Sequence, residues 1–223
     1  MGLSDTELQN LFGAGFIVAI VVWLVWRRLR MKPLMRRLVS VPVTKLSGVG
    51  EGEVVRVVGV IQGHGIRLRA PLTGLRSAWY HTGVYERERV GSLMHGGWIY
   101  WNPVLREQRG FDFTIDDSTA IARIHGDSLR VLSPPDLDDR VGWLLEPNER
   151  ERGYLQQNRV PVRRWFGQRE LRLAETVLEP GDRVAVVGRV RSVSHGEEGR
   201  VGYEITALPE GFVLLSDERR ALA

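Results

Sequence analysis

The feature that most constrains this chain is an uncharged run of sixteen residues, LFGAGFIVAIVVWLVW, at positions 11–26. At about 1.5 Å per residue, such a helix is slightly shorter than the roughly 30 Å hydrocarbon layer of a bilayer, and leucines on both sides extend it. Two tryptophans near its end and a basic cluster after it are typical of a membrane boundary. We therefore expect a transmembrane helix at 11–29, the alternative being a buried helix of a soluble protein. The expected anchor residues are Trp23, Trp26, Arg27, Arg28, Arg30, Lys32, Arg36 and Arg37.

The charges that flank this run predict its orientation. Residues 1–10 contain two acidic residues and no Lys or Arg, whereas six basic residues follow the run within eleven positions. Since positive charge stays on the cytoplasmic side, we expect a short extracytoplasmic N-terminus at 1–10 and a cytoplasmic domain. The start lacks the basic region and cleavage site of a signal peptide, so we expect the segment to be retained. The predicted localisation is the plasma or inner membrane, as a single-pass protein.

The basic stretch RMKPLMRRLVS at 30–40 has apolar residues at nearly helical spacing, interrupted by Pro33. This pattern favours a short amphipathic segment on the membrane surface, or else a continuation of the spanning helix past the proline. Its positive charges favour contact with anionic lipid head groups, at about 1 kcal/mol each. Without the six-residue cluster the chain has 25 basic and 27 acidic residues, a net charge of −2. This balance argues against general nucleic-acid binding by the soluble part.

The remaining sequence, 41–223, is rich in β-branched residues and turn signals, which predicts a mainly β soluble domain, an antiparallel sandwich or barrel. We expect strands at 53–61, 67–69, 78–90, 98–101, 111–115 and 120–124. The polar, proline-punctuated stretch 134–164 is expected to be a loop.

Two of the β segments resemble each other. GEVVRVVGVI at 52–61 aligns with GDRVAVVGRV at 181–190, and each has a turn glycine, an acid and a glycine at one common strand position. A glycine inside a strand permits the sharp coiling of a small closed barrel. The repeat therefore favours an OB-like barrel, with two related halves as one possibility and chance similarity as the other.

Several motifs together resemble the GIDE domain, also called the BAM ("beside a membrane") domain. PLTG at 71–74, SAWY at 77–80 and ERE at 86–88 are similar to its opening signature. FTIDDSTA at 113–120 and the segment 170–190, with Glu175 and Val186-Val187-Gly188, are similar to its later segments. The resemblance covers roughly 51–215, most of the soluble chain.

This family includes a mitochondrial outer-membrane ubiquitin-protein ligase in which a RING finger carries the ligase chemistry. A RING needs zinc ligands that are chiefly cysteines, and this chain has no cysteine. Ser77 stands where the family often has Cys, and Ala120 where it often has Gly. The resemblance therefore implies the membrane-side domain without the ligase module, like the short RING-free forms of bacteria and archaea.

Little in the sequence suggests catalysis. The absence of cysteine excludes thiolate metal sites and cysteine nucleophiles, and no two histidines lie within four residues of each other. Neither Ser118 nor Ser194 has a nucleophile-elbow sequence. Asp116 and Asp117 fit a turn between strands better than a pair of catalytic carboxylates. We expect no catalytic residue, no metal and no cofactor.

Aromatic residues near the predicted turn at 71–74 are the remaining candidates for a binding surface, against the alternative that they only pack the core. The candidate partner-binding residues are Pro71, Thr73, Gly74, Trp79, Tyr80, Glu86, Trp98 and Trp101. The leading hypothesis is a non-catalytic interaction or scaffold module that binds a protein partner. The alternatives are ubiquitin-ligase-type activity with a RING from another polypeptide, and OB-type binding of an oligonucleotide or polysaccharide. Homo-oligomerisation stays open.

Overall fold

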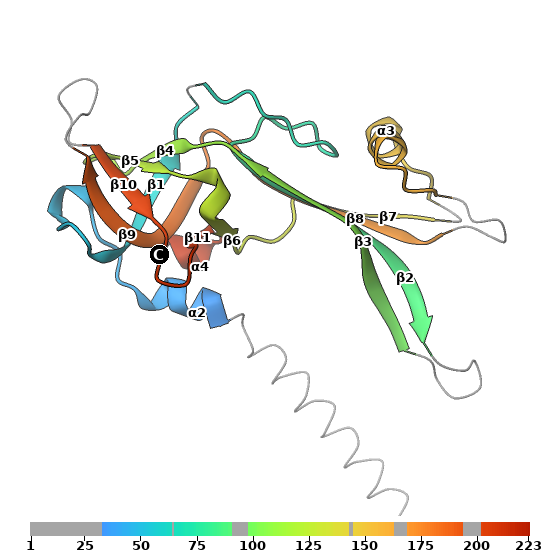
Figure 1. Ribbon diagram of the computed structural model, residues 1–223, viewed down its shortest axis with the longest axis horizontal. Coiled ribbons are helices and arrows are strands. Elements are labelled where there is room, and N and C mark those ends of the chain that lie inside the picture. Colours follow the sequence, from blue (N-terminus) through green and yellow to red (C-terminus); the bar gives the residue numbers. More distant parts are fainter. Residues whose placement is uncertain (1–32, 64, 91–97, 143–144, 163–168, 194–201) are drawn as a thin grey trace, which may run out of the picture.

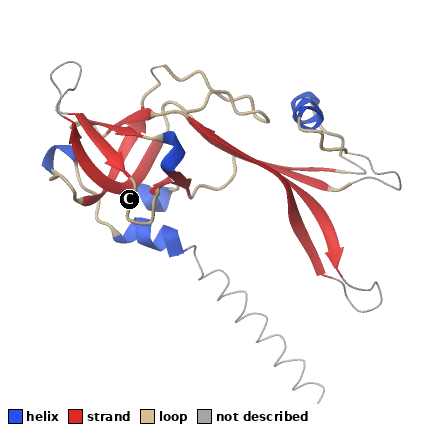
Figure 2. Cartoon of the chain, in the orientation of Figure 1, coloured by secondary structure: helices blue, strands red, loops and turns tan. Residues whose placement is uncertain are grey.

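The computed structural model describes residues 33–63, 65–90, 98–142, 145–162, 169–193 and 202–223. The predicted transmembrane helix at 11–29 lies outside these residues, as do the anchor residues Trp23, Trp26, Arg27, Arg28, Arg30 and Lys32. No helix within the described ranges is long and apolar enough to cross a membrane. The described chain is mainly β, as predicted, and its strands form two sheets (Figures 1 and 2).

Five strands of the larger sheet close into a small barrel. They are β1 (Val54–Ile61), β4 (Phe113–Asp116), β5 (Ile121–Ile124), β10 (Gly202–Thr206) and β9 (Arg183–Val193). They pair in this order, and β9 closes the ring on β1. All neighbours are antiparallel except β5 and β10, which are parallel. The apolar residues predicted on one face of the repeat strands fill the barrel core. They are Val55, Val57, Ile61, Val184, Val186 and Val190.

The two copies of the sequence repeat are partners across the closing seam. Val57 lies opposite Val186, its own equivalent, so the antiparallel pair β1–β9 is related by a local two-fold axis. The backbone bonds follow the same symmetry: the N–H of Gly52 donates to Val190 at 2.8 Å, and that of Gly181 donates to Ile61 at 2.8 Å. Both glycines have positive φ, +82° and +96°. Each repeat thus begins with a turn that only glycine adopts readily.

Strand β11 (Val213–Ser216) pairs with β9 beside β10, and β6 (Leu129–Val131) follows it at the sheet edge. Helices α2 (Pro33–Ser40) and α4 (Arg219–Leu222) contact each other on this part of the sheet. Helix α2 is amphipathic, as expected of 30–40, but its apolar residues Met35 and Leu38 are buried in a cluster with Leu214 and Ala221. The apolar spacing predicted the helix but not what the helix packs against. The apolar face of α2 contacts the protein core and does not face a membrane surface.

The second sheet is inserted between barrel strands. Hairpin strands β2 (Trp79–Val90) and β3 (Trp98–Gly110) connect β1 to β4, while β7 (Leu137–Val141) and β8 (Leu171–Leu178) lie between β5 and β9. They pair in the order β3-β2-β8-β7. The strand expected at 98–101 is therefore much longer. Its register with β2 shifts at Pro103 and Val104, where a proline without an N–H interrupts the ladder.

The polar stretch 134–164 contains β7 and helix α3 (Glu149–Gln157), so the expected loop is corrected to a loop that carries two regular elements. The helix begins with a capping box, in which Asn148 and Glu151 bond each other's backbone N–H. Tyr154 and Leu155 of α3 pack on Leu173 of β8 in a separate apolar cluster. The strand expected at 67–69 is reduced to a single bridge between Arg69 and Arg76. Two short 3-10 helices, η1 (Leu46–Gly48) and η2 (Gly126–Ser128), complete the described elements.

Candidate functional site

The turn at Pro71–Gly74, predicted to bind a partner, is held by a buried carboxylate. Glu175 of β8 is fully buried and accepts bonds from the backbone N–H of Leu72 at 3.0 Å and Thr73 at 2.7 Å. It also accepts the hydroxyl of Thr82 at 2.7 Å. Gly74 has φ +74°, and a Cβ there would meet the guanidinium of Arg150 at 2.1 Å. Thr73 and Gly74 therefore have a structural role in shaping this turn. Pro71 is half-buried beside them.

Tyr80 and Glu86 also make contacts that tie elements together. The hydroxyls of Tyr80 and Tyr154 both donate to the carboxylate of Glu107, at 2.8 and 3.0 Å, which joins β2, β3 and α3. Burial, and then the bond to Glu107, raise the pKa of both tyrosines well above their usual range, so both stay protonated. Glu86 is buried and forms an ion pair with Arg169 at 2.9 Å.

The three tryptophans of the predicted aromatic surface lie in different surroundings. Trp79 is 3% exposed and its ring stacks on His81, with centroids 6.4 Å apart. Trp101 lies under the guanidinium of Arg140, at 5.7 Å. Trp98, by contrast, is 81% exposed at the far end of β3. The structure therefore does not gather the predicted residues into one site.

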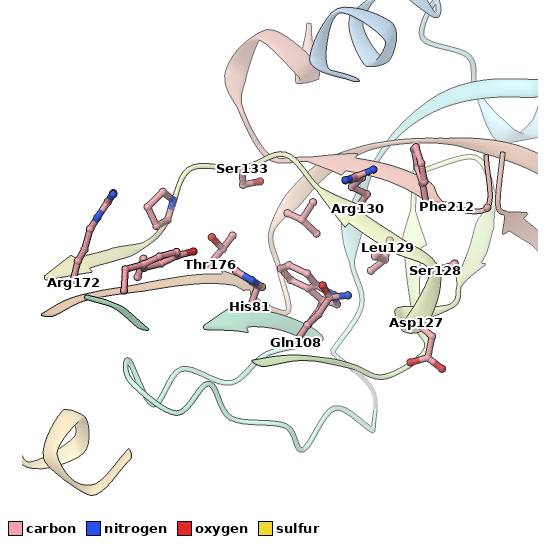
Figure 3. A pocket seen from close by; sticks show the side chains of 16 residues that line it. His81, Gln108, Asp127, Ser128, Leu129, Arg130, Ser133, Arg172, Thr176 and Phe212 are labelled. Atoms are coloured by element: carbon pink, nitrogen blue, oxygen red, sulfur yellow. The ribbon is translucent and has the colours of Figure 1, made fainter. Parts of the chain in front are cut away.

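A cleft of about 610 Å³ lies between the two sheets (Figure 3). One wall is the face of the second sheet that is turned away from α3, with His81, Gln108 and Thr176 on adjacent strands. The other wall comes from the barrel side, where Arg130 of β6 and Phe212 line the cleft. Successive residues of β8 alternate between the α3 side and the cleft side, which places Arg172 and Thr176 on the cleft side. This face of the sheet is therefore partly polar.

Arginines stacked on aromatic rings surround this cleft. Arg130 lies over Phe212 at 5.1 Å. Arg106 lies over Tyr85, a cleft residue, at 5.9 Å, and Arg140 lies over Trp101 further along the same sheet face. We call the cleft together with Arg106, Arg130 and Arg140 the arginine cleft. Stacking fixes the flat face of a guanidinium while its N–H edges remain able to bind.

The charges of the arginine cleft are only partly neutralised. Arg172 is paired with Asp138 through two bonds of 2.5 and 2.6 Å, which also lower the pKa of Asp138. Among the described residues, Arg106, Arg130 and Arg140 form no ion pair with a carboxylate. Burial, and then the charge of Arg106, lower the pKa of His81, so its ring is neutral at pH 7. The cleft thus combines these three cationic groups with neutral hydrogen-bonding groups and with one carboxylate in its lining, that of Asp127.

This arrangement is suited to binding an anionic, extended ligand. Guanidinium groups bind carboxylates and phosphates through paired N–H groups, while Gln108, Thr176 and Ser133 provide polar contacts between them. Within the described ranges, no group of His, Asp and Glu side chains is arranged to hold a metal ion.

Sequence reasoning missed the arginine cleft. Its three arginines come from β3, β6 and β7, and they meet only through the pairing of strands far apart in the chain. The alternation within 78–90 predicted a long strand, but it gave no sign of what lies across from either face of that strand.

Comparison of the chain with protein-family models, with curated proteins and with solved structures gives no match.

Proposed function

We propose that this protein is a single-pass membrane protein whose cytoplasmic β domain is a non-catalytic interaction module, and that it binds an acidic segment of a partner protein in the arginine cleft. The observation that carries the proposal is the set of three arginines stacked on rings around one cleft, none of which forms an ion pair within the described residues. Stacking limits the side-chain entropy that each arginine loses on binding.

The membrane part of the proposal is supported by sequence alone. The apolar run at 11–26 and the basic residues after it are the pattern of an anchor. Helix α2 begins at Pro33 and packs on the domain, so an anchor at 11–29 would hold the domain close to the bilayer. Arg36 and Arg37 would then face anionic lipid near the membrane, although Arg37 also pairs with Glu210 at 2.6 Å.

We further propose an OB-like barrel and membership of the GIDE/BAM family. A closed ring of five strands with a single parallel pair supports the first proposal. For the second, motif residues that lie far apart in sequence are in contact: Glu175 binds the PLTG turn. Asp117 of the FTIDDSTA segment accepts bonds from Thr119 and Ala120 and shapes its turn. Residues that carry the resemblance thus stabilise two turns of the domain, the PLTG turn and the turn after Asp117.

An acidic protein segment fits the cleft better than an oligonucleotide does. Single-stranded nucleic acid is bound largely by stacking bases on aromatic side chains, but here Phe212, Tyr85 and Trp101 already lie under arginines.

The test uses a photo-crosslinking residue in place of Gln108, in the full-length protein and its native membrane. We expect crosslinks to an Asp- and Glu-rich segment of one protein, and loss of these crosslinks in the double variant Arg106→Ala/Arg130→Ala. The matched control is Arg67→Ala, which removes an exposed arginine outside the cleft. Crosslinks that persist in the double variant would contradict the proposal.

A direct measurement complements the crosslinking. A labelled hepta-glutamate peptide and an oligodeoxynucleotide of equal charge are titrated onto the detergent-solubilised protein. Each arginine replaced by alanine is expected to weaken peptide binding about tenfold, or ~1.4 kcal/mol. Tighter binding of the oligonucleotide would favour the OB-type ligand instead.

A further inference from the structure

The hairpin formed by β2 and β3 extends beyond the rest of its sheet. The pairing of β2 with β8 ends at Glu86 and Leu171, but its pairing with β3 continues to Val90 and Trp98. The last pairs are therefore a two-stranded ribbon without a neighbouring strand, and Figure 1 shows it projecting from the molecule. Three residue pairs beyond Arg87 correspond to about 10 Å of ribbon. We call the described part of this segment, 88–90 and 98–100, the ribbon end.

The ribbon end exposes three large side chains with apolar surface, of which Trp98 is by far the most exposed. Trp98 is 81% exposed, Ile99 46% and Tyr100 43%. Successive residues of a strand point to opposite faces, so Trp98 and Tyr100 lie on one face and Ile99 on the other. A protein partner that covered one face would leave the other in water. Apolar groups on both faces fit a medium that surrounds the ribbon end.

The residue types are those of a membrane interface. Tryptophan and tyrosine favour the head-group layer because their rings are apolar and each carries one polar group. The Tyr100 hydroxyl donates to Glu88, and the Asn102 amide donates to the same carboxylate at 3.0 Å. These bonds satisfy the hydroxyl of Tyr100 and the carboxylate of Glu88 near the ribbon end.

The position of the ribbon end indicates that the lipid bilayer is what covers its exposed side chains. Helix α2, where the chain from the apolar run enters the domain, lies at the same edge of the molecule as the ribbon end (Figure 1). We infer that the ribbon end inserts into the interfacial layer of the membrane that holds the anchor. This inference rests on the membrane anchoring proposed above. The head-group layer occupies roughly 5–8 Å on each side of the hydrocarbon, which a ribbon of about 10 Å can cross.

Insertion would give the domain two attachments to the membrane. One is the chain at Pro33, and the other is the ribbon end at the opposite end of the second sheet from the barrel. Two separated contacts restrict rotation of the domain about its anchor. The arginine cleft would then be held in one orientation relative to the bilayer.

The absence of cysteine allows a clean test with single-cysteine variants. Trp98→Cys in the full-length protein is labelled with an environment-sensitive fluorophore and reconstituted into phosphatidylcholine/phosphatidylglycerol vesicles. Phe111→Cys is the matched control, because Phe111 is also an exposed aromatic residue, 55% exposed, just beyond the other end of β3. Alkaline carbonate extraction measures the anchoring separately.

We expect the blue shift on moving from detergent micelles to vesicles to be larger for the label at position 98 than for the label at position 111. Nitroxide lipids labelled near the head group should quench the label at position 98 more than nitroxide lipids labelled deep in the acyl chain. The label at 111 should stay accessible to aqueous iodide. Retention of the protein after carbonate treatment together with iodide quenching at position 98 would overturn the inference and leave the anchoring intact. Extraction by carbonate would overturn both. A change that appears only as the protein-to-lipid ratio rises would indicate a second copy of the chain as the occupant and overturn insertion.

Discussion

The barrel and the second sheet are stabilised in different ways. The barrel closes on itself and its core residues are almost all aliphatic, such as Val57, Val186 and Ile205. The second sheet has an apolar cluster of its own, with Leu173 and Leu155, and in addition buries two acids, Glu175 and Glu86, each satisfied by specific partners. Apolar burial is tolerant of sequence, whereas a buried carboxylate requires every partner in place. This difference explains why the barrel strands could be predicted from the sequence. It also explains why the polar cleft lies on the second sheet.

The largest expected effect comes from Glu175→Ala in the second sheet. The substitution leaves two backbone N–H groups and the Thr82 hydroxyl buried without an acceptor, so we expect a loss of about 3–5 kcal/mol in the free energy of unfolding. Denaturant unfolding of the solubilised protein measures the loss. Hydrogen exchange should rise first at the turn 71–74 and in β2, and later in the barrel.

The matched control is Glu170→Ala, which removes an acid from an exposed ion pair with Arg87. Surface pairs contribute about 0–1 kcal/mol. If Glu175→Ala were as mild as this control, buried polar contacts would not be what holds the second sheet.

A smaller loss is expected from Gly188→Ala in the barrel. A Cβ at this position would lie 2.4 Å from Ile205 Cγ2 and 2.7 Å from the backbone oxygen of Thr206, so β9 and β10 must separate locally. We expect a loss of about 1–3 kcal/mol, measured by thermal or denaturant unfolding. Gly48→Ala is the control, because no atom lies within 4 Å of a Cβ there. Equal stability of the two variants would mean that the contact between β9 and β10 is loosely packed.

The smallest effect is a pH dependence of the barrel at its rim. His125 contacts Asp112 at 2.9 Å and also Glu204. The bond to Glu204, and then that to Asp112, raise the pKa of His125 above its usual 6.5. This stabilisation is complete below the unfolded pKa and is lost as the pH rises through the folded pKa.

Because His125 is 42% exposed at its side chain, we expect less than about 1 kcal/mol from this contact. In the natural protein the temperature of the unfolding midpoint should decrease as the pH rises above the ordinary histidine pKa of about 6.5. In His125→Gln this fall should be absent. A fall of equal size in the variant would assign the pH dependence to other groups.

The barrel could be predicted because its strands carry their pattern locally. Segment 53–61 is rich in β-branched residues, and the glycine repeat at 52–61 and 181–190 indicated a small barrel, although it did not predict that these two strands pair with each other. Strand β7, LDDRV, could not be predicted, since it is polar and owes its place to pairing with β8 and to the bonds between Asp138 and Arg172. Local composition cannot reveal a strand whose partners are distant.

The candidate site was predicted less well for a related reason. Thr73 and Glu86 were predicted to bind a partner, and in the structure they contact other parts of the domain, Glu175 and Arg169. Trp98 was singled out for its aromatic character, and its exposure keeps it a candidate. The arginine cleft had no local signature, because its residues are separated in sequence and meet only in the folded chain.

The distance in sequence between the two strands of the symmetric seam determines how long β1 remains unpaired during synthesis of the protein. Val57 and Val186 are 129 positions apart, and a ribosome adds about 5–20 residues per second, so β1 waits roughly 6–26 s for its partner. During that interval the apolar face of β1 is not covered by β9. If the anchor has already inserted, this exposed face lies close to the membrane. Chains that end before residue 190 lack the last seam contacts, and nascent fragments of this kind should be prone to aggregation and proteolysis.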